Sequence, residues 1–312
     1  MSGVVILGAG PGGASLAFLL ARRGTDVTLH ERQTDFAREF RGEVLLPGGL
    51  DPFKQMGLWD ELDTVPHVTL NAAQLYVNGK FHDDPTPMDV VWCRLPVPEW
   101  FVSDPHLRGY LGGGHLLITA PVPEGYMQIG WIIAKGKYGE LRERGVPELL
   151  DRMAAHASPD FAEHLRRHRN DAVQPFLLSV VSDRAAHWSR PGLLLIGDAA
   201  HTMSPVGAQG LNIAIRDAIV AANHLVPAFE HGAAPDAIDA AAQRVETERL
   251  PEVVEIQNFQ AVPPRFLLRN AWWTRIVLPW LPYVLRSGIT GTRGVALFRR
   301  VAFGVTDVRL TV

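Results

Sequence analysis

Three glycines near the amino terminus have the spacing of a phosphate-binding loop. The stretch Gly8-Ala9-Gly10-Pro11-Gly12-Gly13 carries the pattern G-x-G-x-x-G at its first, third and sixth positions. In such a loop the first glycine permits a tight turn, the second lets the backbone approach a pyrophosphate, and the third lets helix and strand pack closely. The first N–H groups of the following helix would face the phosphates. The pattern alone is weak evidence, because a glycine-rich turn without a ligand can also produce it.

The elements predicted around this loop make a nucleotide site the better interpretation. An apolar strand is predicted at residues 3–7, a helix at about 12–23, and a second strand at 26–30. This order implies two parallel strands joined by a right-handed crossover. Glu31 follows the second strand, about twenty residues after the loop, where a carboxylate can accept hydrogen bonds from ribose hydroxyls. That carboxylate disfavours a 2′-phosphate, so the nucleotide bound here should not be NADP; the adjoining Arg32 is a further candidate contact.

A second cluster of small residues lies far along the chain, in GLLLIGDAAHTMSPVGAQGLNIAIRDA at residues 192–218. A short buried strand at 192–196 would deliver Gly197 and Asp198 to its carboxyl end, where ligands bind in open α/β sheets. Asp198 can accept hydrogen bonds from sugar-like hydroxyls. Pro205 would stiffen the loop before a helix at about 209–225, while Gly207 and Gly210 would let the chain bend around a planar ligand. A strand–loop–helix connection without a ligand is the alternative.

Between the two motifs the pattern changes to that of an antiparallel sheet. Asn78-Gly79 separates two short apolar runs, which is a hairpin signal. Further strands are predicted at 88–95, 107–111, 115–120, 126–133 and 173–181, and helices at 146–156, 159–168 and 235–257. The fold class is therefore α/β: a Rossmann-like domain with a parallel sheet, an inserted, mainly antiparallel β-sheet domain, and C-terminal helices. The expected boundaries are 1–66 plus 188–260 for the discontinuous nucleotide domain, 67–187 for the inserted substrate domain, and 261–312 for the C-terminal helical segment.

The two motifs together resemble the FAD-dependent aromatic-ring monooxygenases of the para-hydroxybenzoate hydroxylase type. The resemblance covers about residues 1–80 and 88–260 and rests on GAGPGG with Glu31 and on GDAAHTMSPVGAQGLN with its downstream RDA. It implies an FAD cofactor whose adenosine ribose binds Glu31 and whose ribityl and pyrophosphate region binds Asp198. It also implies that Pro205 lies beside the reactive edge of the flavin and that the backbone of Gly210-Leu211-Asn212 meets its pyrimidine end.

The same resemblance implies an arginine beside the flavin and a reaction with oxygen. In FRGEVLLP, Arg41 is the candidate arginine, with Arg38 as the weaker one and a surface salt bridge as the alternative for Arg41. NADH or NADPH would reduce the flavin, and one oxygen atom of O2 would pass to an electron-rich aromatic or polycyclic substrate. The full set of candidate cofactor-binding residues is Gly8, Gly10, Pro11, Gly12, Gly13, Glu31, Arg32, Arg41, Gly197, Asp198, Pro205, Gly207, Gly210, Leu211 and Asn212. No residue is assigned a catalytic role.

Part of that family's framework is absent. Its members normally carry a third parallel strand and an Asp-Gly motif that touches the flavin and nicotinamide phosphates, yet this sequence contains no Asp-Gly dipeptide. The break falls near residues 81–88. Three hypotheses therefore stay open: a working monooxygenase, a flavin-dependent reductase or dehydrogenase, and a shortened non-catalytic protein that retains FAD binding.

Composition and charge limit the kinds of ligand, cross-link and cellular location that the sequence supports. A formal net charge of -3 gives no support for nucleic-acid binding, and a single cysteine excludes an internal disulfide or a thiolate metal cluster. The twelve histidines lack metal-ligand spacing, so no metal is expected, and His201 could either approach the flavin or pack within its loop. We read no signal peptide and expect a cytoplasmic protein. The apolar stretch 276–285 is too short to span a bilayer; it packs on the protein body or contacts a membrane interface.

The tryptophans supply candidates for an aromatic substrate pocket. Trp92, Trp100 and Trp131 fall in the predicted inserted sheet and could line such a pocket, which Trp272 and Trp273 could cap. Core packing explains each of them equally well. Neither the substrate nor the oligomeric state follows from the sequence.

Overall fold

The structure is a computed structural model that describes residues 3–34, 44–77, 88–112, 115–230, 232, 234–267, 300 and 302–312. Arg38, Arg41, the Asn78-Gly79 turn, the apolar stretch 276–285 and the Trp272-Trp273 pair lie outside these residues. None of the helices in the described ranges combines the length and the apolar character needed to cross a bilayer.

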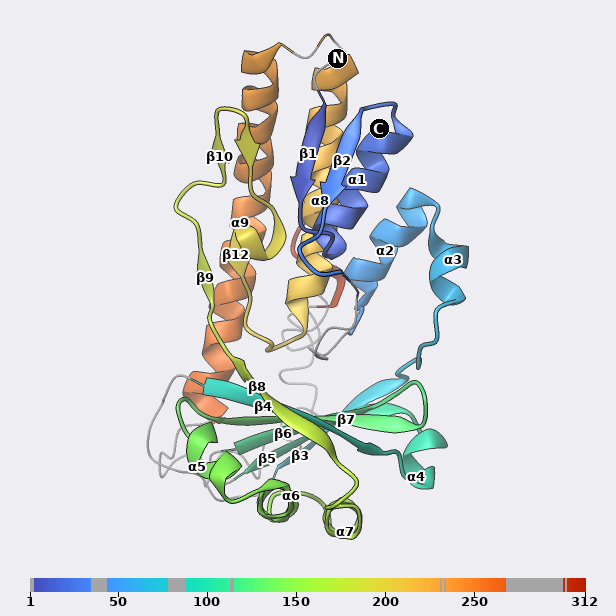
Figure 1. The fold of residues 1–312 in the computed structure, drawn as a ribbon, viewed down its shortest axis with the longest axis vertical. Coiled ribbons are helices and arrows are strands. Elements are labelled where there is room, and N and C mark those ends of the chain that lie inside the picture. The colour runs from blue at the N-terminus through green and yellow to red at the C-terminus, as the bar shows by residue number, and fades with distance from the viewer. Residues whose placement is uncertain are drawn as a thin grey trace, which may run out of the picture.

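The chain begins with the predicted strand–helix–strand unit. β1 (Val4–Leu7) and β2 (Val27–His30) pair in parallel, and α1 (Pro11–Arg22) connects them. Buried Leu16, Leu19 and Leu20 stand three and four positions apart, so they form one apolar stripe of α1. This stripe packs on the long helix α8 (Gln209–Glu230), beside which β1 and β2 also lie in Figure 1.

Two short helices follow in the described residues. α2 (Pro47–Met56) starts with a proline at its first turn and ends at Gly57, whose φ of +72° is the left-handed conformation that favours glycine. α3 (Trp59–Asp63) leads away toward the sheet. α2 also packs on α8 and buries Met56 in the same core as α1.

A six-stranded sheet forms the other end of the molecule (Figure 1). Its strands are β3 (Ala72–Val77), β4 (Met88–Pro96), β5 (His106–Gly112), β6 (His115–Val122), β7 (Tyr126–Ala134) and β8 (Val173–Ser179), in the spatial order β3-β5-β6-β7-β4-β8. Every pair is antiparallel except β3 with β5, which confirms the prediction of a mainly antiparallel sheet. β3 lies at the edge, far from β4 in this order, so no hairpin pairs these two strands.

The two faces of this sheet have different neighbours. Helices α4 (Glu99–Val102), α5 (Tyr138–Glu143), α6 (Val146–Ala154) and α7 (Pro159–Arg167) supply Phe101, Leu141, Leu150 and Phe161 to the core that covers one face. On β4 and β7, Val91, Ile129 and Trp131 point into that core. The alternate residues of these strands, Val90 and Ile132, belong to a separate cluster on the opposite face, which includes Val206 from the loop before α8.

Two long helices complete the fold. α9 (Pro235–Leu267) runs alongside α8 and reaches the sheet (Figure 1). Because α9 is continuous across residue 260, the predicted boundary at that position falls inside a helix. Short ladder segments connect the sheet to α8: β9 (Asp183–Arg184), β10 (Ser189–Arg190), β11 (Leu193–Leu194), the 3-10 turn η1 (Gly197–Ala199) and β12 (His201–Thr202).

The prediction of a buried parallel strand at 192–196 is wrong. β11 covers only Leu193–Leu194, pairs antiparallel with β10, and leaves Leu193 53% exposed. Gly192 takes a φ of +71° in the turn that brings the chain back onto β10. Among the described strands β1 is hydrogen-bonded only to β2, and its Val5 and Leu7 are 62% and 82% exposed.

Candidate functional site

The glycine loop has the geometry that a pyrophosphate requires. Gly8 follows β1 with a φ of +106°, and α1 starts at Pro11 without a side-chain cap. A side-chain carbon placed on Gly8 or Gly10 would meet no atom within 4 Å, whereas one on Gly13 would collide with the Gly8 carbonyl oxygen. The loop is therefore packed tightly at its helix side and open above its first two glycines. This open, uncapped helix N-terminus fits the diphosphate of FAD.

Glu31 lies against the same loop. Its Oε2 accepts a hydrogen bond from the Ala9 amide at 2.8 Å, and its Oε1 accepts one from the Gln33 amide at 3.0 Å. The carboxylate therefore stands beside the glycine loop and fixes the backbone there. Its predicted bond to an adenosine ribose stays a prediction, as does a contact from the exposed Arg32.

The second motif folds onto the first through one residue of α8. A side-chain carbon on Gly12 would lie 3.0 Å from the carbonyl oxygen of Ala214, and one on Gly197 would lie 3.2 Å from the Ala214 Cβ. Both loops thus approach α8 at the same point, although they are separated by more than 180 residues. Asp198 follows Gly197 in η1 with an exposed side chain. The structure therefore brings Gly12 of the first motif and Gly197 of the second to the same residue of α8.

The side chain of Asp217 on α8 anchors the turn formed by residues 197–201. Its Oδ2 accepts a hydrogen bond from the Gly197 amide at 3.0 Å and lies 2.7 Å from Nε2 of His201. Its Oδ1 accepts a hydrogen bond from Nε of Arg249 on α9 at 2.8 Å. His201 is 1% exposed and the centroid of its ring lies 5.0 Å from that of Trp188, so it is packed inside the protein.

A buried charge network extends from Asp217 to the carboxyl-terminal segment. Arg249 also pairs with Glu252, which accepts hydrogen bonds from Arg216 and from the backbone amide of Val305. Burial alone would raise the pKa of Asp217, but Arg249 and the hydrogen bond from His201 outweigh it and hold that pKa below its usual range. Glu252 behaves in the same way, because Arg249 and Arg216 overcome the burial that would raise its pKa.

This network contains the functional residues that sequence reasoning missed. Arg249 and Glu252 sit in a helix whose alternating charges look solvent-exposed, yet both are at most 1% exposed. The only available signal is their spacing of three, which places them on one helix face. What that face meets depends on how α9 packs against α8.

The loop before α8 is held by side chains on both sides. Gly207 and Ala208 have φ angles of +76° and +52°, which bend the chain into the helix. Gln260 of α9 donates to the carbonyl oxygens of Ser204 and Val206 at 2.7 and 2.8 Å. Gln260 carries no sequence signal for this role, because only the fold places it there.

Asn212 binds the other side of the same loop. Its Oδ1 accepts a hydrogen bond from the Leu46 amide at 2.9 Å, and its Nδ2 donates to the Val44 and Ala208 carbonyl oxygens. The side chain of Asn212 is thus structural, and the predicted flavin contact concerns the backbone of residues 210–212. Pro205, Gly207, Gly210 and Leu211 remain at least partly exposed around this loop.

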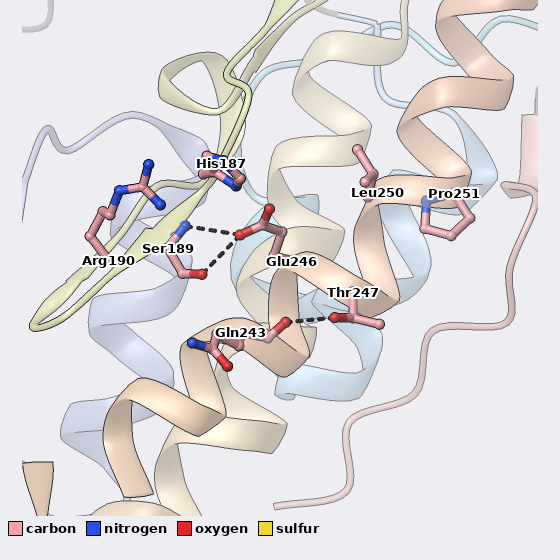
Figure 2. Close-up of a pocket in the computed structure, with 8 residues that line it drawn as sticks. All are labelled: His187, Ser189, Arg190, Gln243, Glu246, Thr247, Leu250 and Pro251. Atoms are coloured by element: carbon pink, nitrogen blue, oxygen red, sulfur yellow. Dashed lines mark hydrogen bonds between the residues drawn. The ribbon is translucent and has the colours of Figure 1, made fainter. Parts of the chain in front are cut away.

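Two surface depressions lie away from these residues. The first, of about 450 Å³, is lined by His187, Arg190 and Glu246 among others (Figure 2). Glu246 accepts hydrogen bonds from both backbone and side chain of Ser189 and so ties the β10 turn to α9. The second, of about 520 Å³, lies beside β9 and α9. Neither is lined by a predicted cofactor residue.

Comparison with known proteins identifies the family. The model of the FAD binding domain family matches residues 1–99 and, in a second stretch, 88–255. 6-Methylpretetramide 4-monooxygenase of Streptomyces rimosus is 25% identical over 98% of this chain and 93% of its own length. That alignment spans 401 positions against 312 residues here, so at least 89 of its positions have no counterpart in this chain. The family match also restarts at residue 88, beside the predicted break.

Solved structures share the fold at lower identity. PqsL of Pseudomonas aeruginosa in complex with 2-aminobenzoylacetate has a TM-score of 0.73 at 16% identity, covering 85% of this chain and 96% of its own. HpxO of Klebsiella pneumoniae complexed with FAD and uric acid has a TM-score of 0.70 at 15% identity, covering 96% and 97%. The family match spans most of the described residues and includes both glycine-rich loops. This chain therefore belongs to the FAD binding domain family.

Proposed function

We propose that this protein is an FAD-dependent monooxygenase that hydroxylates an aromatic or polycyclic small molecule with NADH or NADPH and O2. The observation that carries the proposal is the approach of both glycine-rich loops to Ala214 of α8. It supports a single dinucleotide site that would extend from the uncapped start of α1 toward the start of α8. Two relatives are named as monooxygenases, 6-methylpretetramide 4-monooxygenase and protoasukamycin 4-monooxygenase, and these names support the proposed reaction class.

The described residues have separable roles in this proposal. The amides at the start of α1 bind the diphosphate, Glu31 the adenosine ribose, and Asp198 the ribityl hydroxyls. The bends at Gly207 and Ala208 hold the chain that borders the flavin ring. Bound FAD would supply the redox chemistry, taking a hydride from the nicotinamide and delivering one oxygen atom of O2 to the substrate. The apolar sheet face next to Val206 would exclude water from the reacting groups.

One observation favours a second candidate, a shortened FAD-binding protein without monooxygenase activity. β1 and β2 form a two-stranded sheet whose Val5 and Leu7 are exposed, and at least 89 positions of a relative are missing here. The absent segment would include the Asp-Gly contact to the phosphates. A protein of this kind would bind FAD weakly and reduce O2 only to hydrogen peroxide.

Labelled oxygen separates the two candidates. Protein supplied with FAD, NADH or NADPH, and 6-methylpretetramide is incubated under ¹⁸O2, and product and peroxide are both quantified. A hydroxylated product carrying one ¹⁸O atom supports the monooxygenase. Nicotinamide oxidation with stoichiometric peroxide, or no oxidation at all, would leave the shortened protein as the better description.

A further inference from the structure

The segment at residues 303–306 is held by the buried charge network. Glu252 of α9 accepts hydrogen bonds from the backbone amides of Val305 and Thr306, at 2.8 and 3.3 Å. The hydroxyl of Thr306 donates to the second oxygen of Glu252 at 3.1 Å, and its carbonyl oxygen accepts a hydrogen bond from Nη2 of Arg216 at 2.6 Å. Because Arg216 belongs to α8, these hydrogen bonds hold the segment between α8 and α9.

The same network reaches the turn that presents Asp198. Arg249 pairs with Glu252 through Nη1 and donates from Nε to Asp217 at 2.8 Å. Asp217 in turn accepts the hydrogen bond of the Gly197 amide at 3.0 Å. The three charged side chains are at most 1% exposed, and charges that water does not screen respond strongly to one another. An unbroken series of hydrogen bonds therefore joins the segment to the backbone next to Asp198.

A second contact ties the segment to the loop before α8. A side-chain carbon on Gly48, in the first turn of α2, would lie 2.8 Å from the carbonyl carbon and oxygen of Phe303, so α2 and the segment pack backbone against backbone. The Leu46 amide at the start of α2 donates to Oδ1 of Asn212 at 2.9 Å, and Nδ2 of Asn212 donates to the Ala208 carbonyl oxygen at 2.6 Å. The segment thus contacts the supports of both loops that are proposed to border FAD.

We infer that segment 303–306 positions the turn that presents Asp198 to FAD, and that Thr306 and Glu252 are the positioning residues. They act through the buried charge network and not by contact with the cofactor. Docking of the segment and binding of FAD then favour the same arrangement of the turn, so each strengthens the other by the same factor. This inference rests on the placement of FAD against Asp198 in the proposed function, and it adds to that site a distant segment that sets its affinity.

The first test is Thr306→Val, which removes the hydroxyl and keeps the β-branched shape. Asn223→Ala is the matched control, because Asn223 binds the Arg309 carbonyl oxygen and the Thr311 amide and so holds the same stretch of chain outside the charge network. Titration with FAD should show an affinity about two- to tenfold weaker for Thr306→Val and unchanged for Asn223→Ala. Native affinity in Thr306→Val, or an equal loss in both variants, would overturn the inference.

The second test is amide hydrogen exchange of the native protein, resolved to single residues, with and without saturating FAD. FAD should slow exchange at Val305 and Thr306 about fivefold or more and leave Thr311, which Asn223 holds, unchanged. A purely structural role for the segment would give no such difference, so equal exchange at Val305 in both conditions would also overturn the inference. Failure of the proposed FAD placement would appear separately, as native FAD affinity in Asp198→Ala.

Discussion

The Asp217 carboxylate on α8 accepts a hydrogen bond at 3.0 Å from the backbone amide of Gly197, the residue directly before Asp198. The buried carboxylate of Asp217 thus fixes the backbone next to Asp198, whose own carboxylate is exposed. Asp198 and Asp217 lie 19 residues apart in the sequence. Residue type alone does not show which of them faces a ligand and which supports the fold. Asp217 positions the turn through its contacts with Gly197, His201 and Arg249, while Asp198 is available to a ligand.

Substitution should separate these two roles. Asp198→Ala should leave the unfolding temperature of the apoprotein unchanged and weaken FAD about ten- to hundredfold, because one charge-assisted hydrogen bond worth about 1.5–3 kcal/mol is lost. Asp217→Ala should instead destabilise the fold by about 3–5 kcal/mol, because it leaves Arg249 buried without its partner. Thermal unfolding of apoprotein and titration with FAD measure the two effects. Equal unfolding temperatures for the two variants would contradict the assignment.

The identity of the cofactor gives a direct prediction. The open glycine loop and the neighbouring Glu31 suit an adenosine diphosphate, so the protein should bind FAD and discriminate against FMN, which lacks that half. Acid release followed by chromatography identifies any flavin that copurifies, and titration of apoprotein compares the two flavins. Equal affinity for FMN and FAD would mean that the glycine loop does not hold the nucleotide.

The buried carboxylates should make stability depend on acid pH. The pKa values of Asp217 and Glu252 lie below their ordinary values of 3.8 and 4.5. The unfolded chain therefore binds more protons than the native protein in this range, so stability is complete above the ordinary values and falls as pH drops below them. Denaturant unfolding between pH 3 and pH 7 measures this slope. Asp217→Asn, which cannot titrate, should flatten it, and an unchanged slope would argue against a role for Asp217.

The exposed face of β1 should promote self-association. Val5 is 62% exposed on a strand that pairs only with β2 among the described strands, and such an edge presents free N–H and C=O groups. Val5→Thr keeps the β-branched shape and lowers hydrophobicity, so it should shift the protein toward monomer. Val102→Thr is the control, since Val102 is 60% exposed on the short helix α4. Sedimentation velocity at several concentrations measures the shift, and a monomeric native protein would remove the basis of the prediction.

The sequence by itself determined the local elements and the family. The G-x-G-x-x-G spacing at Gly8, Gly10 and Gly13 acts within a few residues, so its turn, its helix start and its neighbouring strand could all be predicted. The alternation of side chains along β4 and β7 also predicted strands from the sequence. This alternation is a property of a single segment and needs no knowledge of the rest of the fold.

Tertiary structure alone decided which residues meet. The placement of Ala214 against Gly12 and Gly197, the capture of Arg249 by Asp217, and the hold of Gln260 on residues 204–206 all join segments far apart in sequence. It also overturned the predicted parallel strand at 192–196, since an apolar run of that length becomes such a strand only when a neighbouring strand pairs with it. Strand pairing, burial and charge neutralisation depend on what packs opposite each residue. The sequence of one segment does not specify which other segment packs against it.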